Sequence, residues 1–276
     1  MENQEQTPHK RRVRYKGKYP KKFEEKYKEL QPEKYKDTIE HVIQKGNTPA
    51  GMHISIMVKE IIDFLNIQPG ETGFDATLGY GGHTKAMLKC LNGKGHIYAT
   101  DVDPEESAKT KKRLAEQGFG EDMLTVKLQN FCTIDEIAKE VGGFDFILAD
   151  LGVSSMQIDN PKRGFSFKVD GPLDLRLNQE AGISAAERLD TISRDELAGM
   201  LYENSDEPYC EELAKAITDE IRKGNRIDTT TMLRQVIEKT LDFLPEKEKK
   251  DTIKKTCQRT FQALRIDVIR EIDGLY

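Results

Sequence analysis

Three glycines in four positions follow a short apolar stretch that ends at Asp75, in the sequence DATLGYGGHT. Glycines such as Gly79 and Gly81 permit positive φ and let backbone N–H groups approach a ligand closely. A helix predicted to begin just after them would favour a carboxylate or phosphate at its N-terminus. Asp101 follows about twenty residues later, where an acidic residue typically binds ribose hydroxyls. The pattern predicts a site for an adenosine-containing cofactor, although tight turns also use glycine for geometry alone.

The elements on either side of this loop must hold it in place, and strands alternate with helices there. Apolar stretches predict four strands, at residues 72–79, 95–103, 124–131 and 144–152. Apolar residues at helical spacing predict helices at residues 53–67, 83–92, 104–118 and 134–142. This alternation predicts parallel strands joined by right-handed crossovers. The expected fold class is therefore α/β, with a doubly wound, mostly parallel sheet.

The predicted pattern changes after residue 156, where a loop is followed by one helix after another. A helical insertion of this length falls within the size range of a small domain. The chain is therefore expected to contain four regions. They are a basic and aromatic N-terminal arm (1–48), a cofactor-binding α/β domain (49–156), a helical insertion domain (157–256), and a helix that returns to the α/β domain (257–276).

The N-terminal arm differs in charge from the chain as a whole, because the full sequence has a formal net charge of −5. Between Lys10 and Lys22 there are eight Lys or Arg residues and no acidic residue, with Tyr15, Tyr19 and Phe23 interleaved or adjacent. Such an arm can follow phosphates and offer aromatic faces to unpaired bases, which predicts RNA contact. A solvated, disordered arm is the alternative interpretation.

Cysteine spacing and hydropathy exclude several classes of protein. The four cysteines are far apart and form no C-x-x-C pair, so we expect reduced thiols, with neither a zinc site nor a disulfide framework. No stretch approaches the ~18 apolar residues of a membrane helix, and no apolar core follows the basic N-terminus. A cytoplasmic protein without a membrane partner or a bound metal is expected. The cysteines are Cys90, Cys132, Cys210 and Cys257.

The identity of the cofactor depends on the residues around the glycine loop. The dinucleotide pattern G-x-G-x-x-G would require glycine at position 84, where the chain has Thr84, and this makes NAD less favoured. Asp75, Asp101 and Asp150 are predicted to end strands. Three acidic residues there suit S-adenosylmethionine, because its ammonium and ribose groups require hydrogen-bond acceptors.

Four stretches of the sequence resemble a known family: DATLGYGGHT, DLGVSSMQID, RGFSFKVDGPLDLRLN and RTFQALRIDVIREI. They are similar to motifs of the S-adenosylmethionine-dependent methyltransferases that modify N4 of a cytidine in small-subunit ribosomal RNA. The resemblance extends from about His53 to the C-terminus. It implies a class I methyltransferase-like Rossmann fold and a partner that is either the ribosomal RNA or the assembled small subunit. The implied cofactor-binding residues are Gly81, Gly82, His83, Asp101, Phe131, Asp150 and Gln157.

Several of these residues have a structural alternative. His83 could cap or pack a helix, Phe131 could belong to the core, and Gln157 could be an ordinary loop residue. Asp150 is the candidate catalytic residue, because a carboxylate bonded to the cytosine amine would help to localise its lone pair. The same carboxylate could instead bind only the cofactor.

Basic residues in two segments are candidates for RNA contact. The loop at 160–176 could cover the pocket mouth and bind RNA, or brace the insertion. Two arginines near the C-terminus could bind phosphate or pair with acidic residues, and pairing is favoured. The residues are Lys162, Arg163, Lys168 and Arg176 in the loop, with Arg259 and Arg265 in the later segment.

The sequence departs from the family pattern mainly at its end. The family continues beyond the position of Tyr276 with a further strand and a Ser-Phe-His-Ser-Leu-Glu-Asp-Arg segment, so a sheet with an exposed hydrophobic edge is expected. A truncated form, a shortened paralogue and a homologue completed by a partner subunit are the three interpretations. The functional alternatives are a non-catalytic RNA-binding module and a methyltransferase for another RNA base; the oligomeric state is left open.

Overall fold

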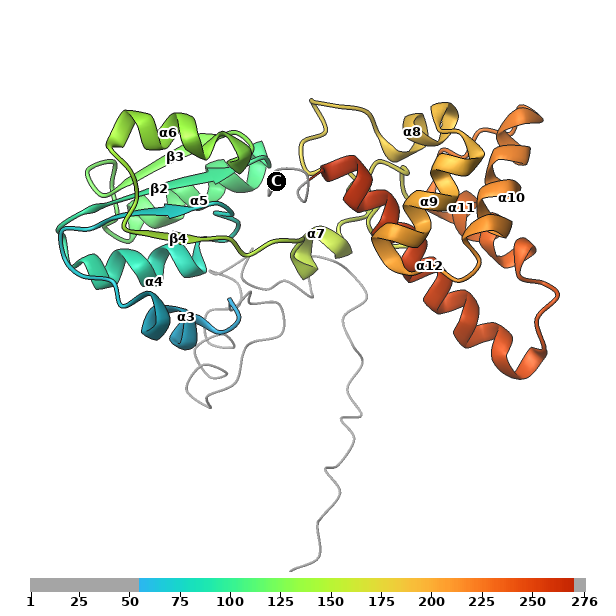
Figure 1. The fold of residues 1–276 in the computed structure, drawn as a ribbon, viewed down its shortest axis with the longest axis horizontal. Coiled ribbons are helices and arrows are strands. Elements are labelled where there is room, and N and C mark those ends of the chain that lie inside the picture. The colour runs from blue at the N-terminus through green and yellow to red at the C-terminus, as the bar shows by residue number, and fades with distance from the viewer. Residues whose placement is uncertain (1–54, 271–276) are drawn as a thin grey trace, which may run out of the picture. The chain divides into compact units, whose positions relative to one another are not determined.

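The computed structural model of the protein describes residues 55–270, so the predicted arm at 1–48 lies outside the described part of the chain. A four-stranded sheet with the order β3-β2-β1-β4 forms the first half of this part (Figure 1). All three pairs of neighbouring strands are parallel. The strands are β1 (Thr72–Asp75), β2 (His96–Asp101), β3 (Leu124–Leu128) and β4 (Phe146–Leu148). The predicted α/β fold is confirmed, and the strand order reverses between β1 and β4, where such sheets bind ligands.

Helices cover both faces of this sheet, and Figure 1 shows α4 and α6 on opposite sides of it. Helices α3, α4 and α5 share one buried cluster with Ile97 and Ala99 of β2. Helix α6 packs on the other face with Phe74 and Phe131. Because successive strand residues point to opposite faces, Tyr98 contacts this second cluster. The bounds are α3 (Val58–Leu65), α4 (Gly82–Leu91), α5 (Pro104–Glu116) and α6 (Ile134–Val141).

Helix α5 begins with a cap that the sequence encodes locally. Asp103 precedes Pro104, the first helical residue, and its Oδ1 accepts the backbone N–H groups of Glu105 and Glu106 at 3.2 Å and 3.1 Å. A carboxylate at this position satisfies N–H groups that have no partner within the helix, and proline suits the first helical position. The start of α5, directly behind the end of β2, is fixed in this way.

A segment with little regular structure follows β4. It contains the short helix α7 (Ser155–Asp159) and the 3-10 helix η3 (Pro161–Arg163). Backbone hydrogen bonds hold the remainder: the N–H of Leu175 donates to the carbonyl of Arg163 at 3.0 Å, and the N–H of Leu173 donates to Asp228 at 2.8 Å. The segment is therefore folded onto itself and tied to a residue that follows it in the sequence.

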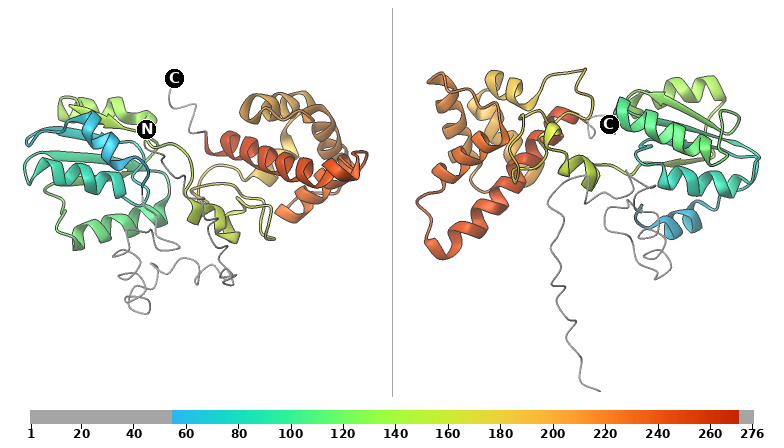
Figure 2. Two further views of the ribbon diagram at one scale, coloured as in Figure 1. Left: turned by 90° about the horizontal axis from the view of Figure 1, so that it is seen from below. Right: turned by 180° about the vertical axis from the view of Figure 1, so that it is seen from behind.

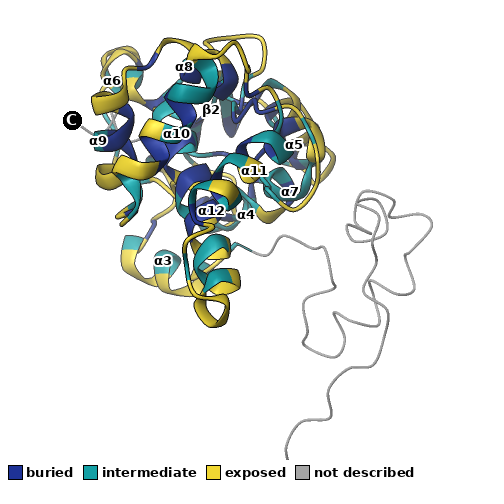
Figure 3. Ribbon diagram, turned by 90° about the vertical axis from the view of Figure 1, so that its right-hand side faces the viewer, coloured by how far each residue is buried: buried dark blue, intermediate teal, exposed yellow. Residues whose placement is uncertain are grey.

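Five helices, α8–α12, form the second half of the described chain and gather around one another (Figures 1 and 2). They share a hydrophobic cluster that includes Leu197, Leu213, Leu233 and Phe261. Figure 3 shows buried stretches on α9, α10 and α12. The bounds are α8 (Ala185–Thr191), α9 (Arg194–Ser205), α10 (Cys210–Arg222), α11 (Thr230–Thr240) and α12 (Glu246–Ile269).

The structure differs from the expected boundary between the insertion and the returning helix. Helix α12 (Glu246–Ile269) runs continuously across residues 256 and 257. Its buried residues Cys257, Phe261 and Leu264 belong to the helical cluster, and α12 packs against α9. The predicted separate helix at 257–276 is wrong in this respect, because the apolar face of the segment is covered by other helices. The other domain boundaries stay predictions.

Strand β4 has a neighbour on one side only within residues 55–270. Ile147 in this strand is 53% exposed, as is expected of an apolar side chain at an uncovered sheet position. Among the described helices, none combines the length and the apolar character that crossing a membrane requires.

Cys257 and Cys132 are expected to differ in reactivity. Burial raises the pKa of the Cys257 thiol to about 12, whereas Cys132 is exposed. Because the thiolate is the reactive form, Cys257 should resist a thiol-specific reagent at pH 8 until the protein unfolds. Titration of free thiols in native and denatured protein checks this, with Cys257→Ala and Cys132→Ser as a matched pair. Loss of a fast-reacting thiol in native Cys257→Ala would contradict the expectation.

Candidate functional site

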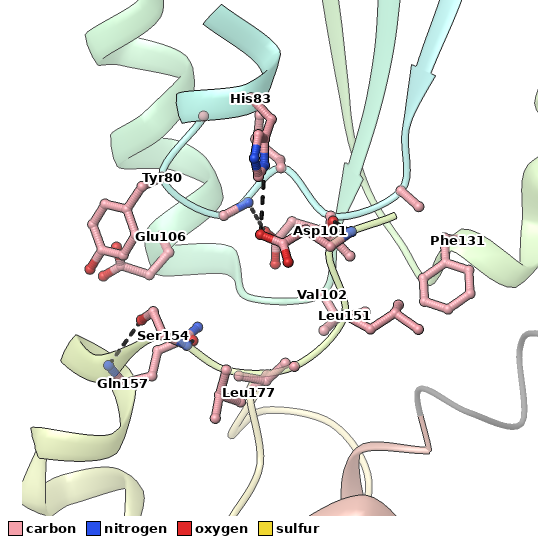
Figure 4. Close-up of a pocket in the computed structure, with 18 of the residues that line it drawn as sticks. Tyr80, His83, Asp101, Val102, Glu106, Phe131, Leu151, Ser154, Gln157 and Leu177 are labelled. Carbon is pink, nitrogen blue, oxygen red and sulfur yellow. Dashed lines mark hydrogen bonds and ion pairs between the residues drawn. The ribbon is translucent and has the colours of Figure 1, made fainter. Parts of the chain in front are cut away.

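A pocket lies at the carboxyl ends of the four strands. The space within it, counted together with open solvent, is about 950 Å³. The loops that follow β1, β2, β3 and β4 all contribute to its lining (Figure 4). The structure brings together here the seven cofactor-binding residues that the family resemblance implied: Gly81, Gly82, His83, Asp101, Phe131, Asp150 and Gln157.

The loop between β1 and α4 has the conformation for which its glycines were proposed. Gly79 and Gly81 have φ values of 47° and 67°, and Gly81 is the N-cap of α4. A Cβ atom on Gly81 would lie 2.8 Å from Cγ2 of Thr110, and one on Gly82 would lie 2.2 Å from Oγ of Ser55. Side chains are therefore excluded both by backbone conformation and by close neighbours.

The Gly81→Ala variant is expected to be destabilised by about 2 kcal/mol, because alanine is strained at positive φ and its methyl group would also approach Thr110. Gly93→Ala is the matched control, since Gly93 has a φ of 74° with no atom within 4 Å of the added Cβ. Urea unfolding of both variants would separate backbone strain from the clash. Equal losses in free energy of unfolding would show that Thr110 contributes nothing.

Asp101 lies at the centre of the pocket floor, between Phe131 on one side and Tyr80 on the other (Figure 4). Its Oδ2 accepts the backbone N–H of Gly79 at 2.8 Å, and its Oδ1 accepts that of Asp103 at 2.9 Å. Burial raises the pKa of Asp101 above its ordinary value, and these two hydrogen bonds oppose the rise. A carboxylate offers about four acceptor positions, so capacity for ligand hydroxyls remains.

Asp75 was expected to supply another hydrogen-bond acceptor for the cofactor, but its side chain is buried outside the pocket. Its carboxylate is 1% exposed and does not line the pocket. Oδ2 accepts the hydroxyl of Thr84 at 2.6 Å, and Oδ1 accepts the backbone N–H of Thr77 at 3.1 Å. Burial raises the pKa of Asp75, and the Thr84 hydroxyl bond is the largest opposing effect. Asp75 therefore braces the loop from inside, and the Thr84 hydroxyl has a structural role there.

His83 and Asp150 face each other across the pocket. The Nδ1 atom of His83 lies 3.6 Å from Oδ2 of Asp150, and its Nε2 lies 2.9 Å from the carbonyl oxygen of Ile56. The imidazole is buried, whereas the Asp150 side chain is 42% exposed. The backbone N–H of Asp150 donates to the Thr77 hydroxyl at 2.7 Å, which joins the loops after β1 and β4. The carboxylate of Asp150 is thus a solvent-exposed hydrogen-bond acceptor on a backbone that Thr77 holds in place.

The wall near Asp101 is apolar. Phe131 is 9% exposed and packs on the core, yet part of it lines the pocket beside Val102 and Leu151. Both interpretations of Phe131 are therefore compatible with its position. Aromatic and aliphatic side chains next to the Asp101 carboxylate suit a planar base such as adenine.

Gln157 enters the pocket from α7 and is already engaged. Its Oε1 accepts the backbone N–H of Ser154 at 2.8 Å, and the N–H of Gln157 donates to the Ser154 hydroxyl at 3.2 Å, which forms a capping box. Its Nε2 donates to Asp103 Oδ2 at 3.3 Å. Gln157 is thus a structural residue of the wall as well as a candidate ligand contact.

Two of the arginines expected to contact RNA are bound within the protein. Arg163 is 6% exposed and pairs with Asp103 at 2.6 Å. Arg176 pairs with Asp174 at 2.7 Å and donates to the carbonyl of Gly182 at 3.0 Å. For these two residues the RNA prediction is wrong, because their donors face acidic and carbonyl oxygens. The exposed residues Lys162 and Lys168 keep that prediction, while Arg259 and Arg265 are half-buried.

The pocket fits S-adenosylmethionine by the chemistry of its groups. Asp101 offers acceptors for ribose hydroxyls, and the exposed carboxylate of Asp150 offers one for an ammonium group. Phe131 and Leu151 supply apolar contact area, and the N-terminal turn of α4 approaches the same space. Within residues 55–270 no group of three or more His, Cys, Asp or Glu side chains is arranged to hold a metal ion.

Several pocket residues were missed from the sequence. Tyr80, Glu106 and Leu177 line the cavity, while Asp103 and Arg163 form a buried pair behind it. Asp103 could have been found, because Asp-Pro-Glu-Glu is a helix-start pattern directly after a predicted strand. Nothing local indicates that Leu177 would reach this pocket.

Comparison with known proteins agrees with this geometry. Residues 50–276 match the model of the MraW methylase family. Ribosomal RNA small subunit methyltransferase H 1 of Agathobacter rectalis is 85% identical over 272 residues, which cover 99% of this chain and 78% of that protein. The protein of the same name from Lachnoclostridium phytofermentans is 69% identical, covering 100% and 75%. Ribosomal RNA small subunit methyltransferase H 2 of Alkaliphilus metalliredigens is 62% identical, covering 100% and 79%.

Proposed function

The chain belongs to the MraW methylase family, and from this premise we propose that it is an S-adenosylmethionine-dependent methyltransferase acting on N4 of a cytidine in small-subunit ribosomal RNA. Use of S-adenosylmethionine is general in such a family and fold. The single observation that carries the proposal is the convergence of all seven proposed cofactor residues on one pocket at the carboxyl ends of the strands. Residues that are up to 76 positions apart in sequence, from Gly81 to Gln157, meet there.

Each part of the pocket has a proposed role. Asp101 accepts the ribose hydroxyls, and Phe131 with Leu151 contacts the adenine ring. Gly81 and Gly82 allow the methionine portion to approach the loop backbone, with His83 behind it. Gln157 and Ser154 close the side formed by α7. S-adenosylmethionine supplies an electrophilic methyl group when it is bound, and the protein aligns the acceptor nitrogen with that group.

Asp150 is the proposed catalytic residue. Cytosine N4 is a poor nucleophile, because its lone pair is delocalised into the ring. The exposed Asp150 carboxylate can accept a hydrogen bond from the N4 amino group and would take its proton as the N–C bond forms and the bond between the methyl group and the sulfonium sulfur breaks, with its electron pair left on sulfur. His83, whose Nδ1 atom lies 3.6 Å from Asp150 Oδ2, fixes the orientation of that carboxylate. The base must be unpaired or flipped outward to reach Asp150.

The RNA substrate is supported by the names of the three relatives. The exposed basic residues Lys162 and Lys168, in the segment next to α7, are proposed to contact its phosphates. The partner would be either the ribosomal RNA or the assembled small subunit. A methyltransferase for another RNA base remains the second enzymatic candidate, and an RNA-binding module without catalysis is the alternative from another class.

Binding and transfer can be tested in one preparation. The purified chain is titrated calorimetrically with S-adenosylmethionine, and methyl transfer to undermodified small ribosomal subunits is then measured, with nucleoside analysis of the product. Binding together with formation of N4-methylcytidine is the expected result. Transfer to a different base would overturn the assignment to N4. Binding without transfer, on subunits that a relative modifies, would support the non-catalytic module, and absence of binding would overturn the cofactor site.

A further inference from the structure

A buried ion pair lies directly behind the pocket, between Asp103 and Arg163. Nη2 of Arg163 donates to Oδ2 of Asp103 at 2.6 Å, and the two side chains are 7% and 1% exposed. Nη1 of Arg163 donates to the carbonyl oxygen of Leu177 at 2.7 Å. Neither member of the pair is among the residues that line the pocket. The proposed chemistry therefore leaves this pair without a role.

Three further partners of this pair belong to the pocket wall. Gln157 donates to the same Oδ2 of Asp103, and the backbone N–H of Glu106 donates to its Oδ1. Leu177, whose carbonyl receives Arg163, lines the cavity as well. The backbone N–H of Asp103 itself donates to Oδ1 of Asp101 at 2.9 Å. The orientation of the Asp101 carboxylate thus depends on the backbone N–H of Asp103. The side chain of Asp103 is in turn held by Arg163.

The energetics of buried ion pairs argue against stability as the sole purpose of this arrangement. Taking two charges out of water costs free energy that their attraction only partly offsets, and apolar pairs of similar volume are often equally stable. An ion pair with additional hydrogen bonds does, however, define one orientation of its members. The Asp103–Arg163 pair is therefore better explained by its effect on the orientation of the pocket residues than by its contribution to the stability of the fold.

We propose that Arg163 is a positioning residue for the cofactor, which acts through Asp103 to aim the Asp101 carboxylate at the ribose hydroxyls. Its second bond, to the carbonyl of Leu177, holds the opposite wall of the pocket at the same time. The inference rests on the proposed cofactor site, and it assigns Arg163 to that site instead of to RNA binding. The segment at 160–177 thus contributes to the cofactor pocket both directly, through Leu177, and indirectly, through Arg163.

The test uses the double variant Asp103→Asn/Arg163→Gln. This change removes both charges together, so no unpaired charge remains buried, and Asn is as good an N-cap for α5 as Asp. The probes are S-adenosylhomocysteine and its 2′-deoxy analogue, titrated calorimetrically below the unfolding temperature. The dissociation constant for S-adenosylhomocysteine is expected to rise about tenfold. The ratio between the two probes, which reports the ribose contact, is expected to fall towards one.

The matched control is Asp174→Asn/Arg176→Gln. This pair lies in the same segment, its side chains are 12% and 18% exposed, and Arg176 also donates to a backbone carbonyl. Neither residue lines the pocket. If general destabilisation of the segment caused the loss of affinity, the control would reproduce it. The proposal instead expects wild-type affinity and a wild-type ratio between the two probes.

A second variant keeps the test decisive if the double variant does not fold. Arg163→Lys retains the positive charge near Asp103. Lysine lacks the planar guanidinium group, so it cannot donate to both Asp103 and Leu177 in the same fixed geometry. It should bind S-adenosylhomocysteine with intermediate affinity and discriminate less against the deoxy analogue. An unchanged ratio in the folded variants would overturn the positioning role. Failure of the wild-type protein to bind S-adenosylhomocysteine would instead overturn the proposed function, so the two failures are distinguishable.

Discussion

The Asp101→Asn variant is expected to bind S-adenosylmethionine about 10-fold to 100-fold more weakly than the wild-type protein, because hydrogen bonds to a charged acceptor contribute about 1.5–3 kcal/mol. The amide keeps one acceptor oxygen but presents an NH₂ group where the second carboxylate oxygen was. Calorimetric titration measures the affinity, and thermal unfolding followed by circular dichroism measures the stability of the same preparation.

The structure adds a stability cost to this prediction. The two oxygens of Asp101 accept the N–H groups of Gly79 and Asp103, and the amide can satisfy only one of them. Leaving one N–H group without an acceptor costs about 1–3 kcal/mol, which lowers the melting temperature without abolishing the fold. Loss of the folded state in Asp101→Asn would contradict the assigned role, since the residue would then be structural.

Asp145→Asn is the matched control for Asp101. Oδ2 of Asp145 accepts the backbone N–H of Thr72 at 2.8 Å, at the opposite ends of the strands. Its replacement by Asn neutralises a carboxylate that also accepts a backbone N–H group in the same sheet, but it does not touch the pocket. Cofactor affinity should stay at the wild-type value in this variant. Equal losses of affinity in the two variants would mean that sheet stability, rather than the ribose contact, determines binding.

The Asp150→Asn variant is expected to slow methyl transfer by about 10²-fold to 10⁴-fold, the range that general acid–base groups typically contribute. The substitution preserves the shape of the side chain and the backbone bond to Thr77, but it removes the negative charge and the basic oxygen. The rate is measured in single turnover with the cofactor and the undermodified small subunit both saturating, so that weaker binding does not affect it.

The same variant separates the two roles proposed for Asp150. If the carboxylate serves only to bind the cofactor, the dissociation constant rises while the single-turnover rate at saturation remains that of the wild-type protein. If it accepts the proton of the N4 amine, the rate falls and the affinity for S-adenosylhomocysteine changes by a smaller factor. An unchanged rate at saturation would therefore remove Asp150 from catalysis.

Most of the α/β architecture was predictable because its signals are local. Alternation of short apolar stretches with helical periodicity predicted four parallel strands and the helices between them. The loop at Gly79–Gly82 was predictable because positive φ at two of its residues requires glycine. The sequence also placed Asp101 at the end of the second strand, and its resemblance to a methyltransferase family, now established, provided the other six proposed cofactor residues.

The partners of charged side chains were not predictable in the same way. Arg163 was expected at an RNA surface, yet its partner Asp103 is sixty positions earlier in the chain. Asp75 was expected to face the cofactor, and a buried hydroxyl from Thr84 holds it on the other side of the loop. Burial and distant neighbours determine such contacts, and neither is encoded in the adjacent residues.

The sequence by itself determined the class of fold, the glycine loop, the acidic residue at the end of the second strand and the family, because short-range patterning and turn chemistry specify these features. Only the tertiary structure decided that α12 continues past residue 257, that Asp75 braces the loop, and that Arg163 lies behind the pocket. The physical reason is that a buried charge or an apolar helix face takes the partner that packing brings to it, and packing is a property of the whole chain.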